Sequence, residues 1–146
     1  MTQRNVVLWV NTCLTYLRTG LLKVPPDVAY PVFVAKVPEG KGFVDSAIGG
    51  TIVLRFDDIF AMFNLYPLHY TFVRLFSLSM EMRIIRDKTP DIVIVDPFYM
   101  CAKHLRSAGD RQVARSHLEG VILANPNKDN VTTGFPIKIF IDKPVF

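Results

Sequence analysis

Residues 76–84 read FSLSMEMRI, and this stretch decides the fold that we expect from the sequence. Its apolar residues alternate without interruption with serine, glutamate and arginine. A side-chain period of two is typical of a β-strand that has one buried face and one solvated face. A helix would spread the same apolar residues around its whole circumference. We therefore predict one antiparallel strand over residues 76–84, with Leu78, Met80 and Met82 buried.

The same alternation recurs in a shorter form at residues 51–56, which read TIVLRF. The segment between the two stretches is rich in aromatic residues and is interrupted by Pro67, which predicts an irregular or partly helical crossing. Further strand candidates are residues 30–37, 92–95, 118–124 and 135–141, whereas residues 101–117 read as a loop with helical turns. Short strands separated by turn residues favour an antiparallel sandwich over a parallel α/β sheet.

The one helix that the sequence predicts spans residues 5–22, where apolar residues recur at intervals of three and four. Its apolar face comprises Val7, Val10, Leu14, Leu17 and Leu21. Two interpretations remain open, since this helix either packs on its own domain or docks on a neighbouring subunit. We expect a single domain over residues 1–146, with an N-terminal helical arm (1–24) and a β-rich body (25–146).

The composition is that of a chain that buries a core, because 50% of its 146 residues are apolar and 21% are charged. The mean hydropathy is positive (+0.26), which suggests that a partner covers part of the surface. We therefore expect a homo-oligomer or a larger assembly. The two cysteines, Cys13 and Cys101, are too few for a disulfide framework and are predicted to be buried free thiols.

The positive charge is concentrated in residues 101–117, where four basic residues are offset only by Asp110. The basic residues are Lys103, Arg106, Arg111 and Arg115. Lysine and arginine neutralise phosphates without reading bases, so this segment predicts sequence-independent binding of nucleic acid. His104, His117 and Tyr99 lie nearby in the sequence as possible stacking or hydrogen-bonding groups. The alternative is a solvated basic face that only keeps the protein in solution.

Three aspartates are candidates for metal binding or acid–base chemistry. Asp96 follows an aliphatic stretch, where carboxylates at strand ends often act in open α/β sheets, but it also precedes Pro97 as a turn-forming residue would. Asp57 and Asp58 have the ligand type that divalent cations prefer, but the same pair caps a chain that leaves a strand. The turn and capping interpretations are the simpler ones for all three.

Other catalytic or metal motifs are missing from the sequence. Cys101 and His104 have the spacing of half a zinc site, but no second pair follows at zinc-finger distance. No serine or cysteine lies in a nucleophile motif. We therefore assign no catalytic residue, metal ligand or cofactor, and we expect a protein that is not an enzyme.

The order of these features resembles that of single jelly-roll capsid proteins, in particular those of small circular single-stranded DNA viruses and satellite-type viruses. The resemblance rests on a strand with an aspartate corner (52–59), an aromatic crossing (60–70), an arginine-containing run into a long alternating strand (72–84), a strand ending in aspartate (92–96) and a Lys-Pro ending (137–144). It implies a mainly β, jelly-roll-like sandwich and a subunit of a viral shell.

Three functions follow as hypotheses. The first is a structural protein, a capsid or shell subunit that self-assembles and contacts nucleic acid through the basic segment. The second is a small subunit of a ribonucleoprotein or of another large complex. The third is a metal-dependent enzyme that uses Asp96 with Asp57 or Asp58. No segment reads as a signal peptide or a membrane span, so the expected location is a virion or the cell interior.

Overall fold

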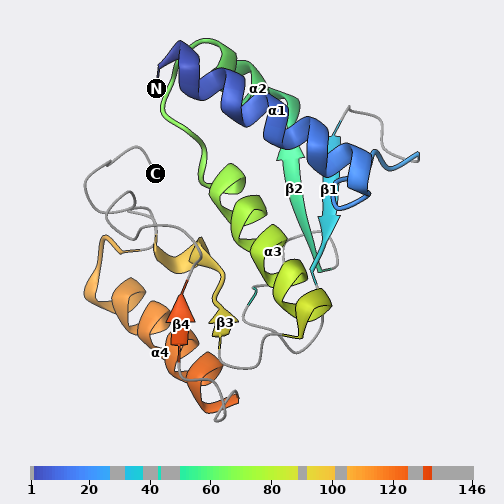
Figure 1. Ribbon diagram of the computed structural model, residues 1–146. Coiled ribbons are helices and arrows are strands. Elements are labelled where there is room, and N and C mark those ends of the chain that lie inside the picture. Colours follow the sequence, from blue (N-terminus) through green and yellow to red (C-terminus); the bar gives the residue numbers. More distant parts are fainter. Residues whose placement is uncertain are drawn as a thin grey trace.

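A computed structural model describes residues 2–26, 32–37, 43, 50–88, 92–100, 105–124 and 130–132 (Figure 1). Within these residues the chain forms four α-helices, one 3-10 helix and four short strands. In chain order they are α1 (Gln3–Thr19), β1 (Val32–Lys36), β2 (Thr51–Arg55), α2 (Phe56–Phe63), α3 (Tyr70–Asp87), β3 (Ile92–Ile94), the 3-10 helix η1 (Pro97–Met100), α4 (Ala108–Ala124) and β4 (Asn130–Thr132). The expected mainly β, jelly-roll-like sandwich and the β-rich body over residues 25–146 are therefore wrong.

Residues 76–84 form the central part of helix α3 and not a strand. The helix buries Arg74, Ser77, Leu78 and Glu81. Positions 74, 77, 78 and 81 lie on one face of an α-helix, because they are three or four residues apart. Leu78 is buried as predicted, whereas Met82 is 37% exposed. The strand prediction failed because two polar residues of the alternating pattern, Ser77 and Glu81, also lie inside the protein.

The ends of α3 are fixed by local groups. The His69 side chain caps the first turn by accepting a hydrogen bond from the backbone N–H of Thr71. At the other end Lys88 adopts a left-handed conformation (φ 52°), which terminates the helix. No proline or glycine lies between Tyr70 and Asp87, so nothing in the sequence interrupts the helix.

Helix α1 confirms the helix expected over residues 5–22. Thr2 caps it by accepting a hydrogen bond from the N–H of Asn5 at 3.2 Å, and Gly20 ends it in a left-handed conformation (φ 81°) that suits glycine. One face packs on the domain, because Val6 and Tyr16 are buried and the ring of Trp9 lies 5.8 Å from that of Phe72. The helix is therefore not a detached arm.

The two small sheets have opposite strand arrangements. Strands β1 and β2 are antiparallel, with Val32 opposite Arg55 and Lys36 opposite Thr51. Strands β3 and β4 are parallel, and α4 connects them in sequence as the crossover helix of a βαβ unit. The strands predicted within residues 30–37, 51–56 and 92–95 are thus confirmed. Residues 118–124 belong to α4 and not to a strand, and residues 135–141 lie outside the described part of the chain.

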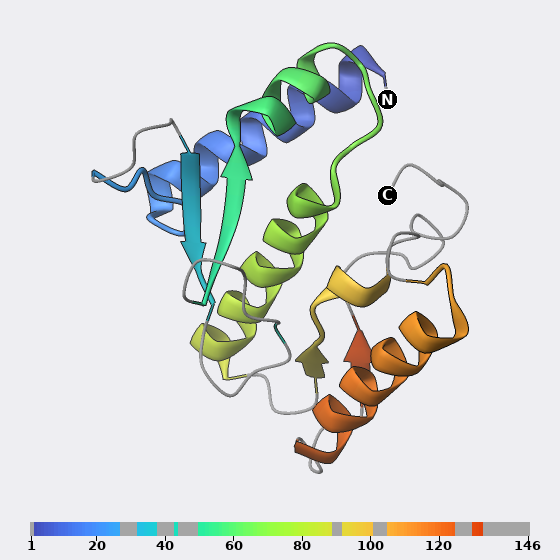
Figure 2. The ribbon, with the colours of Figure 1, turned by 180° about the vertical axis from the view of Figure 1, so that it is seen from behind.

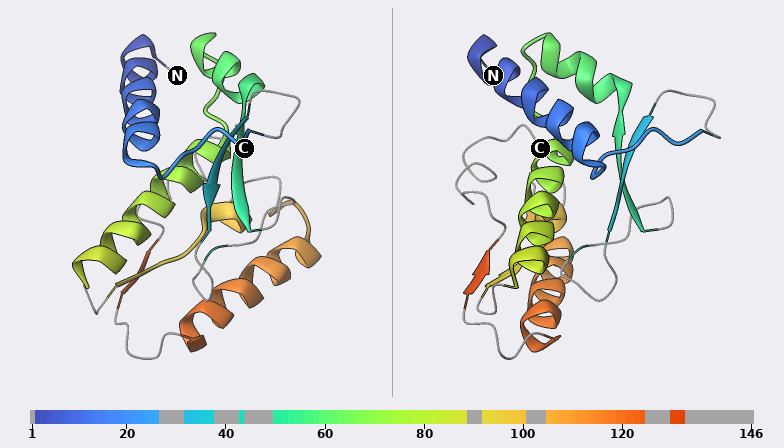
Figure 3. Two further views of the ribbon diagram at one scale, coloured as in Figure 1. Left: turned by 90° about the vertical axis from the view of Figure 1, so that its right-hand side faces the viewer. Right: turned by 45° about the vertical axis from the view of Figure 1, so that its right-hand side comes forward.

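Helix α3 runs between the two halves of the molecule (Figure 2). One half consists of β1 and β2 with α1 and α2, and the other of β3 and β4 with η1 and α4. Helices α1 and α2 lie at one end of the molecule and α4 lies at the other (Figure 3). Surfaces formed by α1 and α2 are therefore well separated from surfaces formed by α4.

Candidate functional site

A cavity of about 150 Å³ opens between helices α1 and α2. Helix α1 lines it with Val10, Cys13, Leu14 and Leu17, and α2 lines it with Ile59, Met62 and Phe63. Phe33 of β1 and Leu54 of β2 also line it. Because the lining side chains are apolar apart from the Cys13 thiol, the cavity suits an uncharged, apolar group.

Large apolar side chains are exposed on both helices that line this cavity. Val7 and Leu14 are seven positions apart and therefore lie on one face of α1. Phe56, Phe60 and Phe63 are separated by four and three positions and therefore lie on one face of α2. We call Val7, Leu14, Phe56, Phe60 and Phe63 the α1–α2 apolar surface; each is more than half exposed. Leu14 and Phe63 both line the cavity, so the two stripes flank its opening.

The two helices that form this surface carry opposite charges. Helix α1 contains Arg4 and Arg18 and no acidic residue, whereas α2 contains Asp57 and Asp58 and no basic residue. Arg4, Arg18 and Asp57 are exposed, and none of the three forms an ion pair with another described residue. An apolar centre with charges at its edge is the usual layout of a protein–protein interface.

The Cys13 thiol lies in the wall of the cavity and is half-buried. Burial raises its pKa from 9.0 to about 11, because desolvation disfavours the thiolate. The thiol is therefore protonated at neutral pH and contributes to the cavity as a small apolar group.

Asp96 is bound within the protein and does not face an open site. Its two carboxylate oxygens accept hydrogen bonds from Nε and Nη2 of Arg74, at 2.9 and 2.7 Å. One of them also accepts the backbone N–H of Phe98 at 3.0 Å, two residues along the chain. That last bond is an aspartate turn, so the turn interpretation of Asp96 is confirmed.

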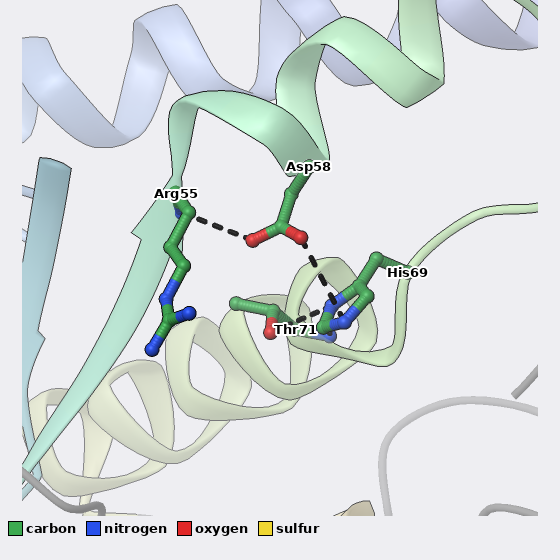
Figure 4. Close-up of polar contacts among 4 residues, drawn as sticks. All are labelled: Arg55, Asp58, His69 and Thr71. Carbon is green, nitrogen blue, oxygen red and sulfur yellow. Dashed lines mark hydrogen bonds and ion pairs between the residues drawn. The ribbon is translucent and has the colours of Figure 1, made fainter. Parts of the chain in front are cut away.

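Asp58 acts as a helix cap, as the simpler interpretation of the Asp57–Asp58 pair predicted. Its Oδ2 accepts the backbone N–H of Arg55 at 3.0 Å, and its Oδ1 lies 3.7 Å from Nε2 of His69 (Figure 4). On the other side of the ring, Nδ1 of His69 lies 2.9 Å from the hydroxyl of Thr71. A catalytic triad uses the same three groups, but there the hydroxyl faces Nε2 and the carboxylate faces Nδ1, the reverse of the arrangement here.

The chemistry of a triad is nevertheless not available to these residues. Thr71 is 4% exposed and lies in the first turn of α3, so a substrate cannot approach its hydroxyl. His69 Nδ1 also accepts the backbone N–H of Thr71, which is its capping role. The three side chains therefore tie the first turn of α2 to the first turn of α3. No group of three or more potential metal ligands occurs among the described residues.

The structure places three of the four predicted nucleic-acid-binding residues. Arg106, Arg111 and Arg115 are all exposed, and the last two lie one turn apart on α4. Nη1 of Arg111 also donates a hydrogen bond to the carbonyl of Leu105 at 3.3 Å. Lys103 and His104 lie outside the described residues. Tyr99 and His117 pack against each other, with their ring centroids 5.1 Å apart.

Sequence reasoning missed the α1–α2 apolar surface. The sequence predicts Phe56 in a strand and the residues after 56 in an irregular or partly helical crossing, which separates Phe56 from Phe60 and Phe63. That spacing of four and three residues, with Ile59 and Met62 between them, marks a helix that is apolar on two faces. It was the available signal for an exposed apolar stripe.

Comparisons with protein families, with curated proteins and with solved structures give no match to this chain. Among the described helices, none combines the length and the hydropathy that crossing a membrane requires.

Proposed function

We propose that this chain is a structural subunit that associates with further copies of itself. Self-association was also predicted from the sequence, for a shell subunit with a jelly-roll fold. The self-association proposed here does not depend on that fold. The observation that carries it is the α1–α2 apolar surface.

The size of the exposed side chains supports this proposal. Scattered apolar residues are common on protein surfaces, whereas a contiguous apolar patch is typical of a binding site. Phe60 is 61% exposed and Phe63 is 58% exposed, although both are large aromatic groups. Aromatic residues are enriched at interfaces because each buries a large apolar area with few rotatable bonds.

Sedimentation velocity of the wild-type chain over a range of concentrations tests this proposal. We expect the weight-average mass to rise with concentration towards that of a defined oligomer. A mass that stays at the 16.6 kDa of the monomer at all concentrations would contradict self-association.

Contact with nucleic acid is a second candidate function of the same subunit. It is supported by the exposure of Arg106, which precedes α4, and of Arg111 and Arg115 on α4, where Asp110 is the acidic residue of the first turn. These arginines lie at the opposite end of the molecule from α1 and α2, so binding to a polyanion would leave the apolar surface free (Figure 3).

A metal-dependent enzyme receives the least support. Asp96 is fully buried and holds Arg74, and Asp58 caps α2 and faces His69. A metal-dependent enzyme needs carboxylate oxygens that face an open cleft and can bind a metal beside the substrate. Neither carboxylate is placed in this way.

A further inference from the structure

We infer that a second copy of this chain covers the α1–α2 apolar surface, with α1 of each copy on α2 of the other. In this arrangement Phe60 of each copy inserts its ring into the cavity of the other. The inference rests on the proposed self-association and specifies the surface, the pairing of helices and the residue that fills the cavity.

The charges favour pairing of α1 with α2 over other pairings. If α1 packed on α1 of a second copy, Arg4 and Arg18 would meet only positive charges. If α2 packed on α2, both helices would bring Asp57 and Asp58 to the contact, and Arg55, which precedes the helix, would be the nearest positive charge. Placing α1 on α2 brings the exposed arginines towards the exposed aspartate, and like charges facing each other across an interface are costly.

Two-fold symmetry makes this pairing self-complementary. In a symmetric dimer, each contact between a residue of one copy and a residue of the other occurs twice. The α1–α2 contact and its equivalent would therefore cover both apolar surfaces at once. Exposed apolar residues elsewhere, such as Leu123 on α4, lie outside this contact, so the contact itself closes as a dimer.

Phe60 is the side chain that best fits the cavity. It is 61% exposed and does not line the cavity of its own chain, so it is free to enter another one. An apolar cavity of roughly 150 Å³ can hold a ring of the size of benzene. Burying an exposed aromatic ring in a preformed apolar pocket is a frequent source of interface binding energy.

A charge-exchange experiment tests the pairing. One variant carries Arg4→Glu and Arg18→Glu, and the other carries Asp57→Lys; all three positions are exposed, so folding is checked by circular dichroism and should be retained. Alone, each variant repels its own copies and should dimerise about tenfold more weakly than wild type. Mixed one to one, the variants place glutamates against lysine in one contact and arginines against aspartate in the other.

The mixture should therefore dimerise within about threefold of the wild-type affinity, as measured by sedimentation velocity. If wild type dimerises but the mixture is no stronger than either variant alone, α1 does not pack on α2 of a second copy, and self-association uses another surface. If wild type stays monomeric, the proposed function itself fails and the inference falls with it.

Alkylation of Cys13 provides a direct readout of the cavity, measured in a Cys101→Ser background. Because Cys13 lines the cavity, entry of the partner's Phe60 should slow its alkylation as the protein dimerises. In Phe60→Ala the rate should not depend on protein concentration. A wild-type rate that stays constant while the dimer forms would show that the cavity is not filled at the interface.

Discussion

Arg74 and Asp96 form a buried, two-bonded ion pair between helix α3 and the end of strand β3, although they are 22 positions apart in the chain. Their side chains are only 5% and 0% exposed. The guanidinium also lies over the ring of Phe98, with its central carbon 4.9 Å from the ring centroid. Such a pair fixes α3 on the half of the molecule that contains β3 and η1.

Replacing Asp96 by alanine should destabilise the protein by about 3–5 kcal/mol, because a buried arginine would lose its carboxylate partner. Equilibrium unfolding in urea measures the change. Asp87 is the matched control, because its ion pair with Arg86 is exposed. Asp87→Ala should cost less than about 1 kcal/mol. Equal losses in the two variants would contradict the buried position of the Arg74–Asp96 pair.

Substitutions on opposite faces of α3 distinguish the helix from the strand expected over residues 76–84. Ser77 is completely buried in the helix, so Ser77→Leu should overpack the core and cost about 1–3 kcal/mol. Met82 is partly exposed, so Met82→Ala should change stability by roughly 0.5 kcal/mol or less. In a strand the order of the two effects would be reversed. Thermal or urea unfolding of both variants settles the order.

The failure of the strand prediction has a physical cause in Ser77 and Glu81. In a half-buried strand these residues would face water, whereas here Glu81 is 3% exposed and accepts the backbone N–H of Ile94 at 3.3 Å. A helix buried on several sides places its polar residues inside when partners are available from another element. Because the partner of Glu81 lies 13 positions along the chain, the local sequence pattern could not reveal it.

Other parts of the fold followed from local sequence. The strands β1, β2 and β3 were predicted from short alternating or aliphatic runs, and α1 from its apolar periodicity, because these signals depend on neighbouring residues. The apolar run at residues 118–124 was predicted to be a strand, and this prediction is wrong because the run belongs to α4. The sequence alone identified the basic residues of the nucleic-acid-binding candidate, Arg106, Arg111 and Arg115. The α1–α2 apolar surface could be recognised only once the structure placed α1 beside α2.

The Cys13 thiol should react slowly with iodoacetamide in monomeric protein. With a pKa of about 11 instead of 9.0, its thiolate fraction at pH 8 is lower by about 100-fold, and alkylation proceeds through the thiolate. The rate is measured with a Cys101→Ser variant at low protein concentration. The same variant unfolded in urea is the reference, and its thiol should react much faster. Similar rates in the folded and unfolded states would contradict the buried position of Cys13.

Binding to duplex DNA should weaken steeply with salt if the arginines of α4 contact phosphates. Replacing Arg111 and Arg115 by glutamine should lower the slope of log K against log salt by about 1–2 units, since each phosphate contact releases about one counterion. Arg83→Gln with Arg86→Gln removes the same charge from exposed positions on α3 and serves as the control. The prediction is contradicted if the wild type does not bind DNA even at low salt, or if the two double variants have the same salt slope. Arg111 and Arg115 would then belong only to a solvated basic face.

The most direct test of the central claim compares Phe60→Glu with Leu123→Glu by sedimentation velocity. Both side chains are exposed, at 61% and 79%, but Phe60 belongs to the α1–α2 apolar surface and Leu123 lies on α4. A buried charge at a hydrophobic interface should weaken self-association by at least about tenfold in Phe60→Glu, while Leu123→Glu should associate like wild type. If Phe60→Glu associates as strongly as wild type, or if both variants weaken equally, the α1–α2 apolar surface is not where copies of this chain meet.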